Sequence, residues 1–305
     1  MGSIRWAGGL VLTNLLLLTS CGTPLVKPVR INPALEALIP ADTVSLFGAN
    51  VEELRQTPLY QKVIQLALPE VDKVTRETGV DPRKDIQEVL VCANETGIVT
   101  LVSGSFNSAQ LEPKLSAAGI PRIPWKGSTL YGTDQSAVAF LGPSILAGGS
   151  TSNLKSVMDR DARHGLPGAL QPLIDAIPAR DQLWAVSSDG IPGFRSGDTQ
   201  RSRLGDVAQM LRGIQDVVVG TDFSKGLNLS ARLDCRTQDD ARHVHDALRG
   251  AIGMARLSTP DNHPELLQVY DAIQVSQGNS RVEVSGDLPA DQVDHVLSLW
   301  LKKPL

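Results

Sequence analysis

The residues of this chain that could act as a nucleophile with an activating cation lie in Ser152-Asn153-Leu154-Lys155. Ser-x-x-Lys is the nucleophile motif of a class of acyl-transfer enzymes that also need a Ser-Asp-Asn and a Lys-Thr-Gly element. The nearest counterparts, Ser188-Asp189-Gly190 and Lys225-Gly226, have a wrong or absent third residue. The segment follows Gly148-Gly149. We therefore expect the serine and threonine residues after these glycines to cap a helix, and we do not expect Ser152 to attack a substrate.

The histidines and glycines of the chain show no pattern typical of a metal or cofactor site. The chain has five histidines, His164, His243, His245, His263 and His295. His243 and His245 are two apart on a predicted helix and point to different faces, whereas metal-binding pairs on helices use spacings of three or four. Asp239 and His243 have such a spacing, which is also common on solvated helices. The chain lacks Cys-x-x-Cys, Gly-x-Ser-x-Gly and GxGxxG patterns. No catalytic residue, metal or cofactor is expected.

The N-terminal segment carries the most specific pattern in the chain. Arg5 is the one charge in the first twenty residues, and an apolar run extends from Leu10 to Leu18. This is the layout of an export signal, and the 15 residues of 6–20 are too few to span a bilayer, which takes ~20. Leu18-Thr19-Ser20-Cys21 closes the segment and resembles the lipobox of bacterial lipoproteins. In that class the cysteine thiol receives a diacylglyceryl group, and cleavage makes the cysteine the new N-terminus.

The lipobox resemblance implies a localisation and a membrane partner. Residues 1–20 would be a lipoprotein signal peptide, and Cys21 the site of lipid attachment, with palmitate-type acyl chains holding the protein on the membrane. Two or more chains give stable attachment. Gly22 follows the cysteine, where an Asp would favour retention on the inner membrane. The resemblance therefore favours the outer membrane, facing the periplasm, over the inner membrane.

Residues 21–33 are expected to join this anchor to the folded part. Three prolines in the twelve residues 22–33 favour an extended spacer. At ~3.1 Å per residue such a tether would reach roughly 35–40 Å. The alternative is that its apolar side chains, Leu25, Val26, Val29 and Ile31, pack onto the folded part.

Composition describes an ordinary water-soluble domain. The formal net charge is −4, charged residues make up 20% and aromatic residues 4%. This acidic balance lacks the basic footprint of a nucleic-acid binder, so envelope proteins or polymers are the remaining partner classes. Cys92 and Cys235 follow apolar strand-like runs. They are expected to be buried free thiols, with a disulfide in an exported compartment as the alternative.

An internal repeat organises the remaining chain. The pattern of residues 34–42 returns in 169–180, 88–91 matches 216–219, and 97–103 matches 226–232. Ser108 and Thr237, which lie 129 residues apart, follow these matches and each open a helix-like segment. The shared order predicts a tandem duplication with units at 34–165 and 166–305.

Hydrophobic periodicity and turn residues predict the elements of each unit. The first unit is expected to contain strand 43–49, a helical region 51–77, strands 88–93 and 97–106, helix 108–118, strands 128–132, 136–141 and 144–148, and helix 151–160. The second is expected to contain strand 182–187, helix 203–214, strands 216–222 and 226–234, helix 237–257, strands 272–277 and 280–286, and helix 289–302. This order predicts the α+β class, with two split-βαβ-like units and largely antiparallel sheets.

Two segments show a second resemblance. Ile39-Pro40-Ala41-Asp42-Thr43 and Gly79-Val80-Asp81-Pro82-Arg83-Lys84-Asp85-Ile86 look like parts of uncharacterised exported proteins and lipoproteins of acidobacteria and planctomycetes. Those relatives carry no assigned activity. The resemblance supports the fold and implies no site.

One loop departs from the repeat and could contact a partner. Residues 189–203 are polar and contain Arg195, Arg201 and Arg203, which could bind an anionic group; the alternative is a solvated connection between a strand and a helix. The sequence favours a non-enzymatic, membrane-anchored envelope lipoprotein that acts in binding, assembly or scaffolding. The alternatives are an envelope hydrolase with dispersed site residues and a carrier of an apolar ligand.

Overall fold

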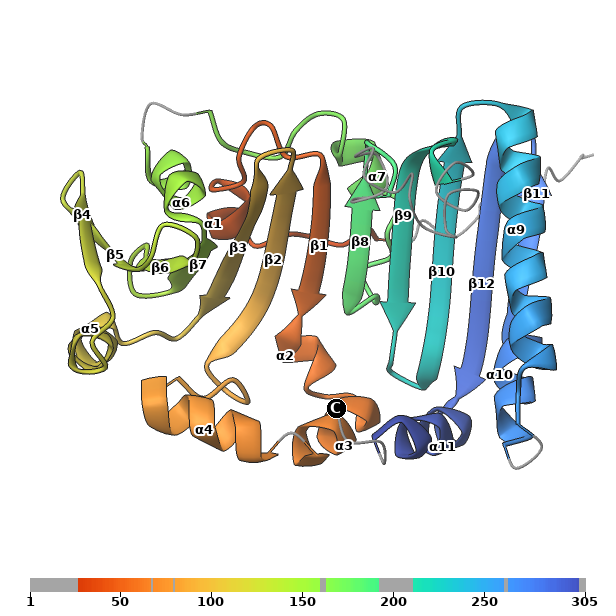
Figure 1. The fold of residues 1–305 in the computed structure, drawn as a ribbon, viewed down its shortest axis with the longest axis horizontal. Coiled ribbons are helices and arrows are strands. Elements are labelled where there is room, and N and C mark those ends of the chain that lie inside the picture. Colours follow the sequence, from red (N-terminus) through yellow and green to blue (C-terminus); the bar gives the residue numbers. More distant parts are fainter. Residues whose placement is uncertain are drawn as a thin grey trace, which may run out of the picture.

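A computed structural model of the chain describes residues 27–66, 68–78, 80–159, 163–191, 211–260 and 263–301. Its strands form one open, twelve-stranded sheet in the order β11-β12-β10-β9-β8-β1-β2-β3-β7-β6-β5-β4 (Figure 1). The strand ladders of the described residues are antiparallel. The α+β class and the antiparallel pairing expected from the sequence are confirmed, in a single sheet.

The strands are β1 (Ser45–Asn50), β2 (Ile86–Asn94), β3 (Gly97–Gly104), β4 (Arg122–Trp125), β5 (Ser128–Gly132), β6 (Ala137–Phe140), β7 (Ile145–Gly149), β8 (Leu183–Ser187), β9 (Ile214–Asp222), β10 (Gly226–Cys235), β11 (Ile273–Gly278) and β12 (Arg281–Pro289). The helices are α1 (Pro33–Glu36), α2 (Val51–Leu54), α3 (Pro58–Leu66), α4 (Leu68–Thr78), α5 (Ser108–Ala117), α6 (Thr151–Met158), α7 (Gln171–Ile174), α9 (Gln238–Leu257), α10 (Glu265–Ala272) and α11 (Ala290–Leu301). Sequence patterns missed β4, α1, α7 and α10, which are short. The helix expected at 203–214 lies almost entirely outside the described residues.

Polar side chains cap the N-termini of several helices. Asn50 accepts a hydrogen bond from the backbone N–H of Glu53 at 3.0 Å and begins α2, and Thr237 accepts one from Asp240 at 3.0 Å and begins α9. The cap of α5 is Asn107, not the expected Ser108. Such side chains satisfy N–H groups that have no partner within the helix.

The sheet is built outward from its centre, where β1 pairs with β8. From this pair, β2, β3, β7, β6, β5 and β4 follow on one side, and β9, β10, β12 and β11 follow on the other. Helices α2 to α4 join β1 to β2, its immediate antiparallel neighbour. This connection differs from the expected split-βαβ arrangement, which places a third strand between the two strands that a helix joins.

The first hairpin on each side of the centre has the same local geometry. The ladder register shifts after Ile86 in β2, and opposite the start of β9 it shifts between Asp234 and Cys235. Gly97 and Gly226 each begin the second strand of their hairpin, with φ of 140° and 137°. An L side chain rarely adopts such an angle, which explains a glycine at both positions.

Two extended segments bond to the stretches that precede β1 and β8. The N–H of Val29 donates to the carbonyl of Ile177 at 2.8 Å, and Gly165 donates to Ile39 at 2.8 Å. Ile31 is 7% exposed and belongs to the core. The expectation of a free tether is therefore wrong for residues 27–33, which pack on the fold. The apolar side chains of this segment pack on the core, which is the alternative expectation stated for it in the sequence analysis.

The core occupies different faces of the sheet in different places. Leu46, Leu90 and Leu101 lie on one face, and α1, α6 and α7 pack there. At the β10–β12 end, α9 covers the opposite face, where Leu233 and Val282 pack with Val244. Helices α3, α4 and α11 lie at one end of the strands (Figure 1). On β1, β2, β3 and β8, the face that α1, α6 and α7 leave free is on the same side of the sheet as the face that α9 covers at β10–β12.

Candidate functional site: an uncharged sheet face

Four neighbouring strands at the centre of the sheet present apolar side chains on both faces. Antiparallel sheets with one wet side normally alternate apolar and polar residues. Here β3, β2, β1 and β8 do not, and twelve uncharged side chains point away from the α1, α6 and α7 layer. In register across the strands they are Ile98, Ala93, Ser45 and Ser187; Thr100, Val91, Phe47 and Ala185; and Val102, Val89, Ala49 and Leu183. We call these twelve residues the uncharged face.

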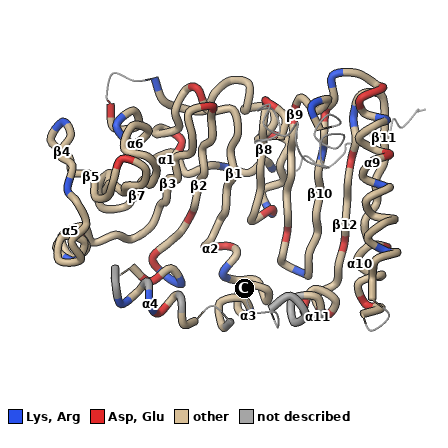
Figure 2. The backbone as a smooth tube through the Cα atoms, in the orientation of Figure 1, with Lys and Arg blue, Asp and Glu red and all other residues tan. Residues whose placement is uncertain are grey.

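The uncharged face is partly open to solvent. Phe47 is 41% exposed and Ile98 is 56% exposed, although both lie within strands. Figure 1 shows no described helix in front of the middle of β1, β2 and β3, and Figure 2 shows little charge there compared with the strand ends and α9. Contiguous exposed apolar surface on a folded protein marks an interaction site more often than isolated apolar residues do.

The hydroxyl groups at the β1–β8 junction of the uncharged face are bonded to each other. Ser45 Oγ and Ser187 Oγ lie 2.7 Å apart and form a buried hydrogen bond across the two strands. Because each satisfies the other, neither needs a partner from outside. The face therefore has the chemistry of a binding surface for apolar groups, and none of its twelve side chains is charged.

Packing on the covered side explains the glycine at position 48. A Cβ atom built on Gly48 would lie 2.1 Å from Cε2 of Trp184, which pairs with it across the β1–β8 ladder. The indole, 3% exposed, fills the space that a larger residue at 48 would need. Phe47, the preceding residue of the strand, points to the open side because successive side chains of a strand alternate between faces.

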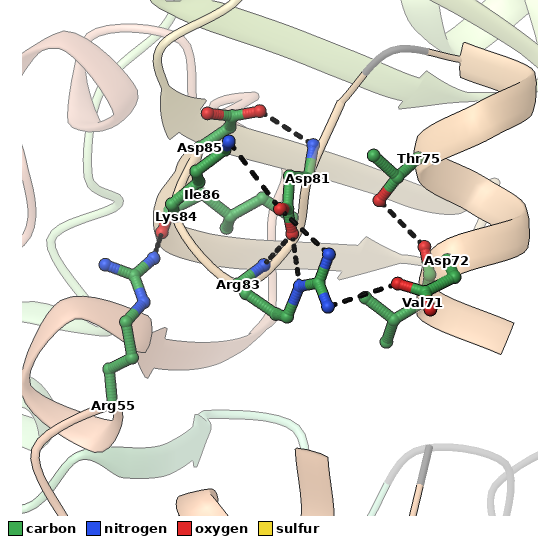
Figure 3. Close-up of polar contacts among 9 residues, drawn as sticks. All are labelled: Arg55, Val71, Asp72, Thr75, Asp81, Arg83, Lys84, Asp85 and Ile86. Atoms are coloured by element: carbon green, nitrogen blue, oxygen red, sulfur yellow. Dashed lines mark hydrogen bonds and ion pairs between the residues drawn. The ribbon is translucent and has the colours of Figure 1, made fainter. Parts of the chain in front are cut away.

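A second polar cluster lies in the turn before β2, within the segment 79–86 singled out above (Figure 3). Asp81 accepts hydrogen bonds from Nε of Arg83 at 2.8 Å and from its Nη2 at 3.0 Å, and Arg83 also pairs with Asp72 of α4 at 3.1 Å. Asp85 accepts from the N–H of Asp81 at 2.7 Å. The hydrogen bonds from Arg83 hold the pKa of Asp81 below its usual range. These groups are hydrogen-bonded or ion-paired with one another and join α4 to β2, so the cluster has a structural role.

Two buried carboxyl groups have raised pKa values. Burial raises the pKa of Glu88 to about 7, opposed by the hydrogen bond from the N–H of Asn32 at 3.2 Å. Burial likewise raises the pKa of Asp181 to about 6, opposed by Arg180. Glu88 lies on the covered side of β2, opposite Ser103 of β3. Both carboxyl groups lie away from the uncharged face.

A polar hollow of about 570 Å³ lies beside the β9–β10 turn. Arg180 and Lys225 supply its positive charges, and Asp222 and Asp287 its negative charges. The Arg180 guanidinium lies 3.8 Å from the Asp222 carboxylate. This mixture of charges selects no single ligand class.

The structure shows where the candidate residues from the sequence lie. Ser152 Oγ is 3.0 Å from Ser150 Oγ, the cap of α6, and Lys155 Nζ lies 4.8 Å from the centre of the Trp125 ring. The hydroxyl and the ammonium are thus engaged separately. Cys92 and Cys235 are buried free thiols, as expected, and burial raises their pKa values to about 12 and about 11.

Among the described residues, no group of three or more His, Cys, Asp or Glu could hold a metal ion. No helix in the same part of the chain is long and apolar enough to cross a membrane. Cys21, Arg195, Arg201 and Arg203 lie outside the described residues.

Sequence reasoning missed the uncharged face, although a signal was present. Val89-Leu90-Val91 and Leu183-Trp184-Ala185-Val186 are continuous apolar runs where a strand with one wet side would alternate. Such runs indicate that both faces are apolar. They do not indicate which face a helix covers.

Comparisons with known proteins found distant structural neighbours. No protein-family profile matches the chain, and no curated protein matches its sequence. Crystal form I of TP0453 is similar with a TM-score of 0.49 and 11% identity, over 88% of this chain and 98% of that one. Form III has a TM-score of 0.49 and 12% identity over 88% and 99%, and form IV has 0.48 and 11% over 90% and 97%.

Proposed function

We propose that this chain is a non-enzymatic lipoprotein of the bacterial cell envelope that acts as a binding module. Its lipid would be attached at Cys21, and it would sit on the outer membrane facing the periplasm. The lipobox pattern and Gly22 support the anchor and its sorting. The observation that carries the binding role is the uncharged face, with Phe47 and Ile98 open to solvent in the middle of a sheet.

We also infer that the module arose by tandem duplication. The first four strands on each side of the β1–β8 pair have the same order, which supports this because a shared order is improbable for unrelated halves, and β5 and β4 have no counterpart on the other side. The reciprocal bonds of Val29 with Ile177 and of Gly165 with Ile39 are further support. The unequal packing of α5 and α9 represents divergence after the duplication. α9 covers β10, β11 and β12, whereas α5 contacts α4.

The hydrolase alternative would need residues that converge in the fold. Glu88 and Ser103 form the most suggestive pair, since they are cross-strand neighbours and the Ser103 hydroxyl is buried without a hydrogen-bond partner among the described residues. Both lie on the covered side of the sheet, and Ser103 is 3% exposed. A substrate would have to displace packed core to reach them, which disfavours this alternative.

The anchor is tested by fractionating cells that produce full-length protein. We expect the wild type in the membrane fraction, with a lipid mass on its N-terminal cysteine. Cys21→Ala should remain unlipidated, because no other thiol lies at the cleavage site. Gly22→Ala is the matched control and should be lipidated like the wild type, whereas Gly22→Asp should move the protein toward the inner membrane. A wild-type protein with no lipid on Cys21 would refute the anchor.

A further inference from the structure

We propose that β11, the strand at one end of the sheet, pairs with β11 of a second copy of this chain (Figure 1). The two strands would run antiparallel about a two-fold axis centred on Val275 and join two twelve-stranded sheets edge to edge. This edge lies apart from the uncharged face. The inference therefore goes beyond the proposed function, because it concerns how copies of the protein associate.

The first argument is that the outer backbone groups of β11 lack a partner among the described residues. Gly278 and Arg281 flank the two-residue turn of the β11–β12 hairpin, and such a flanking pair is hydrogen-bonded. Bonded and non-bonded pairs alternate along an antiparallel ladder, so Val275 and Gln277 direct their N–H and C=O groups away from β12. No described strand lies on that side. These groups form a template that another strand backbone completes.

The second argument is that the opposite edge of the sheet is protected and this one is not. Proline, charge and short length are common protections of edge strands. β4, at the other end, has four residues and contains Arg122 and Pro124. Trp125 and Ser128 flank a two-residue turn, so Pro124 takes a position whose N–H would point outward. β11 has six residues with no charge and no proline, and its ladder with β12 has no bulge.

The other half of the sheet shows that a strand fits at this position. In the strand order that the two halves share, β6 occupies the place that β11 occupies on the other side. β6 pairs with β5 on its outer side, whereas β11 has no such neighbour among the described residues. A strand supplied from outside would thus take the place that β5 takes in the first half.

Symmetry selects a second copy of this chain as the source of that strand. Antiparallel pairing of β11 with itself is isologous and closes after two chains. Pairing of β11 with β4 of another copy would instead continue without end, and Pro124 opposes it. A closed pair therefore uses the unprotected edge and leaves only the protected one exposed.

The backbone groups of β11 match their own copy in this register. The N–H of Val275 would donate to the carbonyl of Val275 in the second copy, and the N–H of Gln277 to the carbonyl of Ile273, each reciprocally. The N–H of Ile273 already donates to the carbonyl of Tyr270, so the register does not require it. No charged side chain of either strand would face one of like sign, because β11 carries none.

The helix beside this edge also favours a folded copy over an isolated peptide. α9 contacts β10 and β12 as well as β11, and its side chains Met254 and Leu257 are 65% and 89% exposed. A two-fold axis perpendicular to the sheet would place α9 of the second copy on the same side. An isolated peptide strand would bring no helical surface there.

The test is a disulfide that only this register allows. Gln274 would lie opposite Ser276 of the second copy in a non-hydrogen-bonded pair, where Cα atoms are ~4.5 Å apart and a disulfide fits. Both residues are exposed. Full-length Gln274→Cys and Ser276→Cys chains are produced together, purified in detergent, oxidised and run on a non-reducing gel. We expect a linked dimer from the pair and none from either variant alone, since identical positions would be ~7–8 Å apart.

The controls separate strand pairing from other association. The wild type should give no linked dimer, because Cys92 and Cys235 are buried. Gln277→Pro, added to both cysteine chains, removes the outward N–H and leaves the bonds to β12, so linked dimer should fall roughly tenfold. Gln277→Ala keeps that N–H and should link as before. Circular dichroism checks the fold of each variant.

Sedimentation equilibrium of the full-length protein in density-matched detergent gives a second measurement. We expect the mass of two chains for the protein without added cysteines, and of one chain for Gln277→Pro. If Gln277→Pro unfolds, the wild-type mass and the cysteine pair still decide the result. A wild-type mass of one chain, a cysteine pair that does not link, or equal linking in each cysteine variant alone would overturn the proposal.

Discussion

At the scale of single residues, burial separates the ionisable side chains that affect the stability of the fold from the exposed apolar side chains to which we assign binding. Glu88 and Asp181 lie on the covered side or at its edge with raised pKa values of about 7 and about 6, and each is a cost to the folded state when ionised. Phe47 and Ile98 are exposed and apolar instead. The ionisable groups with raised pKa values therefore report on stability, and the exposed apolar residues are those to which we assign the proposed binding role.

The pH dependence of stability tests the role of Glu88. Its pKa is about 7 in the folded protein against an ordinary value of 4.5. A raised carboxyl pKa stabilises the fold most below the unfolded pKa, and this contribution is lost as the pH rises from about 4.5 to about 7. Each unit of pKa is worth ~1.4 kcal/mol, so the loss is roughly 3 kcal/mol. We expect the Glu88→Gln variant to lack this pH-dependent loss of stability, as measured by urea unfolding at intervals from pH 4 to 8.

A comparison with Asp181 makes this measurement specific. Asp181→Asn should remove a separate contribution that is lost by about pH 6, because its pKa is raised less. Glutamine at 88 keeps an oxygen to accept from Asn32, so the fold should survive the change. An unchanged slope between pH 5 and 7 in Glu88→Gln would contradict the assignment.

At the scale of elements, the hairpins β2–β3 and β9–β10 and the crossing segments 27–33 and 163–165 hold the sheet in its order. Both hairpins return the chain through a glycine with positive φ. Segment 27–33 bonds to Ile177, ahead of β8, and segment 163–165 bonds to Ile39, ahead of β1. An element that is weak alone, such as a four-residue helix or a short bridge, is stabilised here by tertiary contact.

The two hairpin glycines should respond to alanine by different amounts. A Cβ on Gly226 would lie 2.2 Å from the carbonyl oxygen of Leu288, whereas one on Gly97 would meet the Asn153 side chain at 2.9 Å. Strained φ alone costs about 1–3 kcal/mol at either site. The backbone clash adds a further ~1–3 kcal/mol at Gly226, since a carbonyl in a ladder cannot move away as a side-chain amide can.

Thermal and urea unfolding of Gly97→Ala and Gly226→Ala measure this difference. Gly168→Ala serves as the control, because a Cβ there meets nothing within 4 Å and its φ is not in the left-handed region. Equal losses at Gly97 and Gly226 would show that the clash at Leu288 is relieved by a shift of β12.

At the scale of the whole molecule, the β1–β8 ladder joins the two halves of the chain into one sheet. The main core cluster contains Leu46, Leu90 and Leu101 from the first half together with Ile177 and Trp184 from the second. A smaller cluster lies under α9. Because the main core is shared, neither half has a complete core of its own.

We therefore expect a single cooperative unfolding transition. Leu101→Ala and Leu233→Ala, one in each half, should each lower the midpoint of the entire transition, with losses of about 2–5 kcal/mol for Leu101, which is fully buried. Calorimetry should give equal calorimetric and van't Hoff enthalpies. Two transitions, each sensitive to one variant alone, would show that the halves are independent domains.

The sequence by itself determined the local features of this protein. The strand-forming runs and the start of α9 at Thr237 were predicted because each depends on residues a few positions apart. The export and lipobox pattern stays a prediction from sequence. Tertiary structure decided that β1 pairs with β8, that residues 27–33 pack on the core, and that one face of β1, β2, β3 and β8 stays open. Edge pairing and the covering of a face depend on contacts between residues more than a hundred positions apart, as between Ser45 and Ser187, and periodicity within a strand carries no information about them.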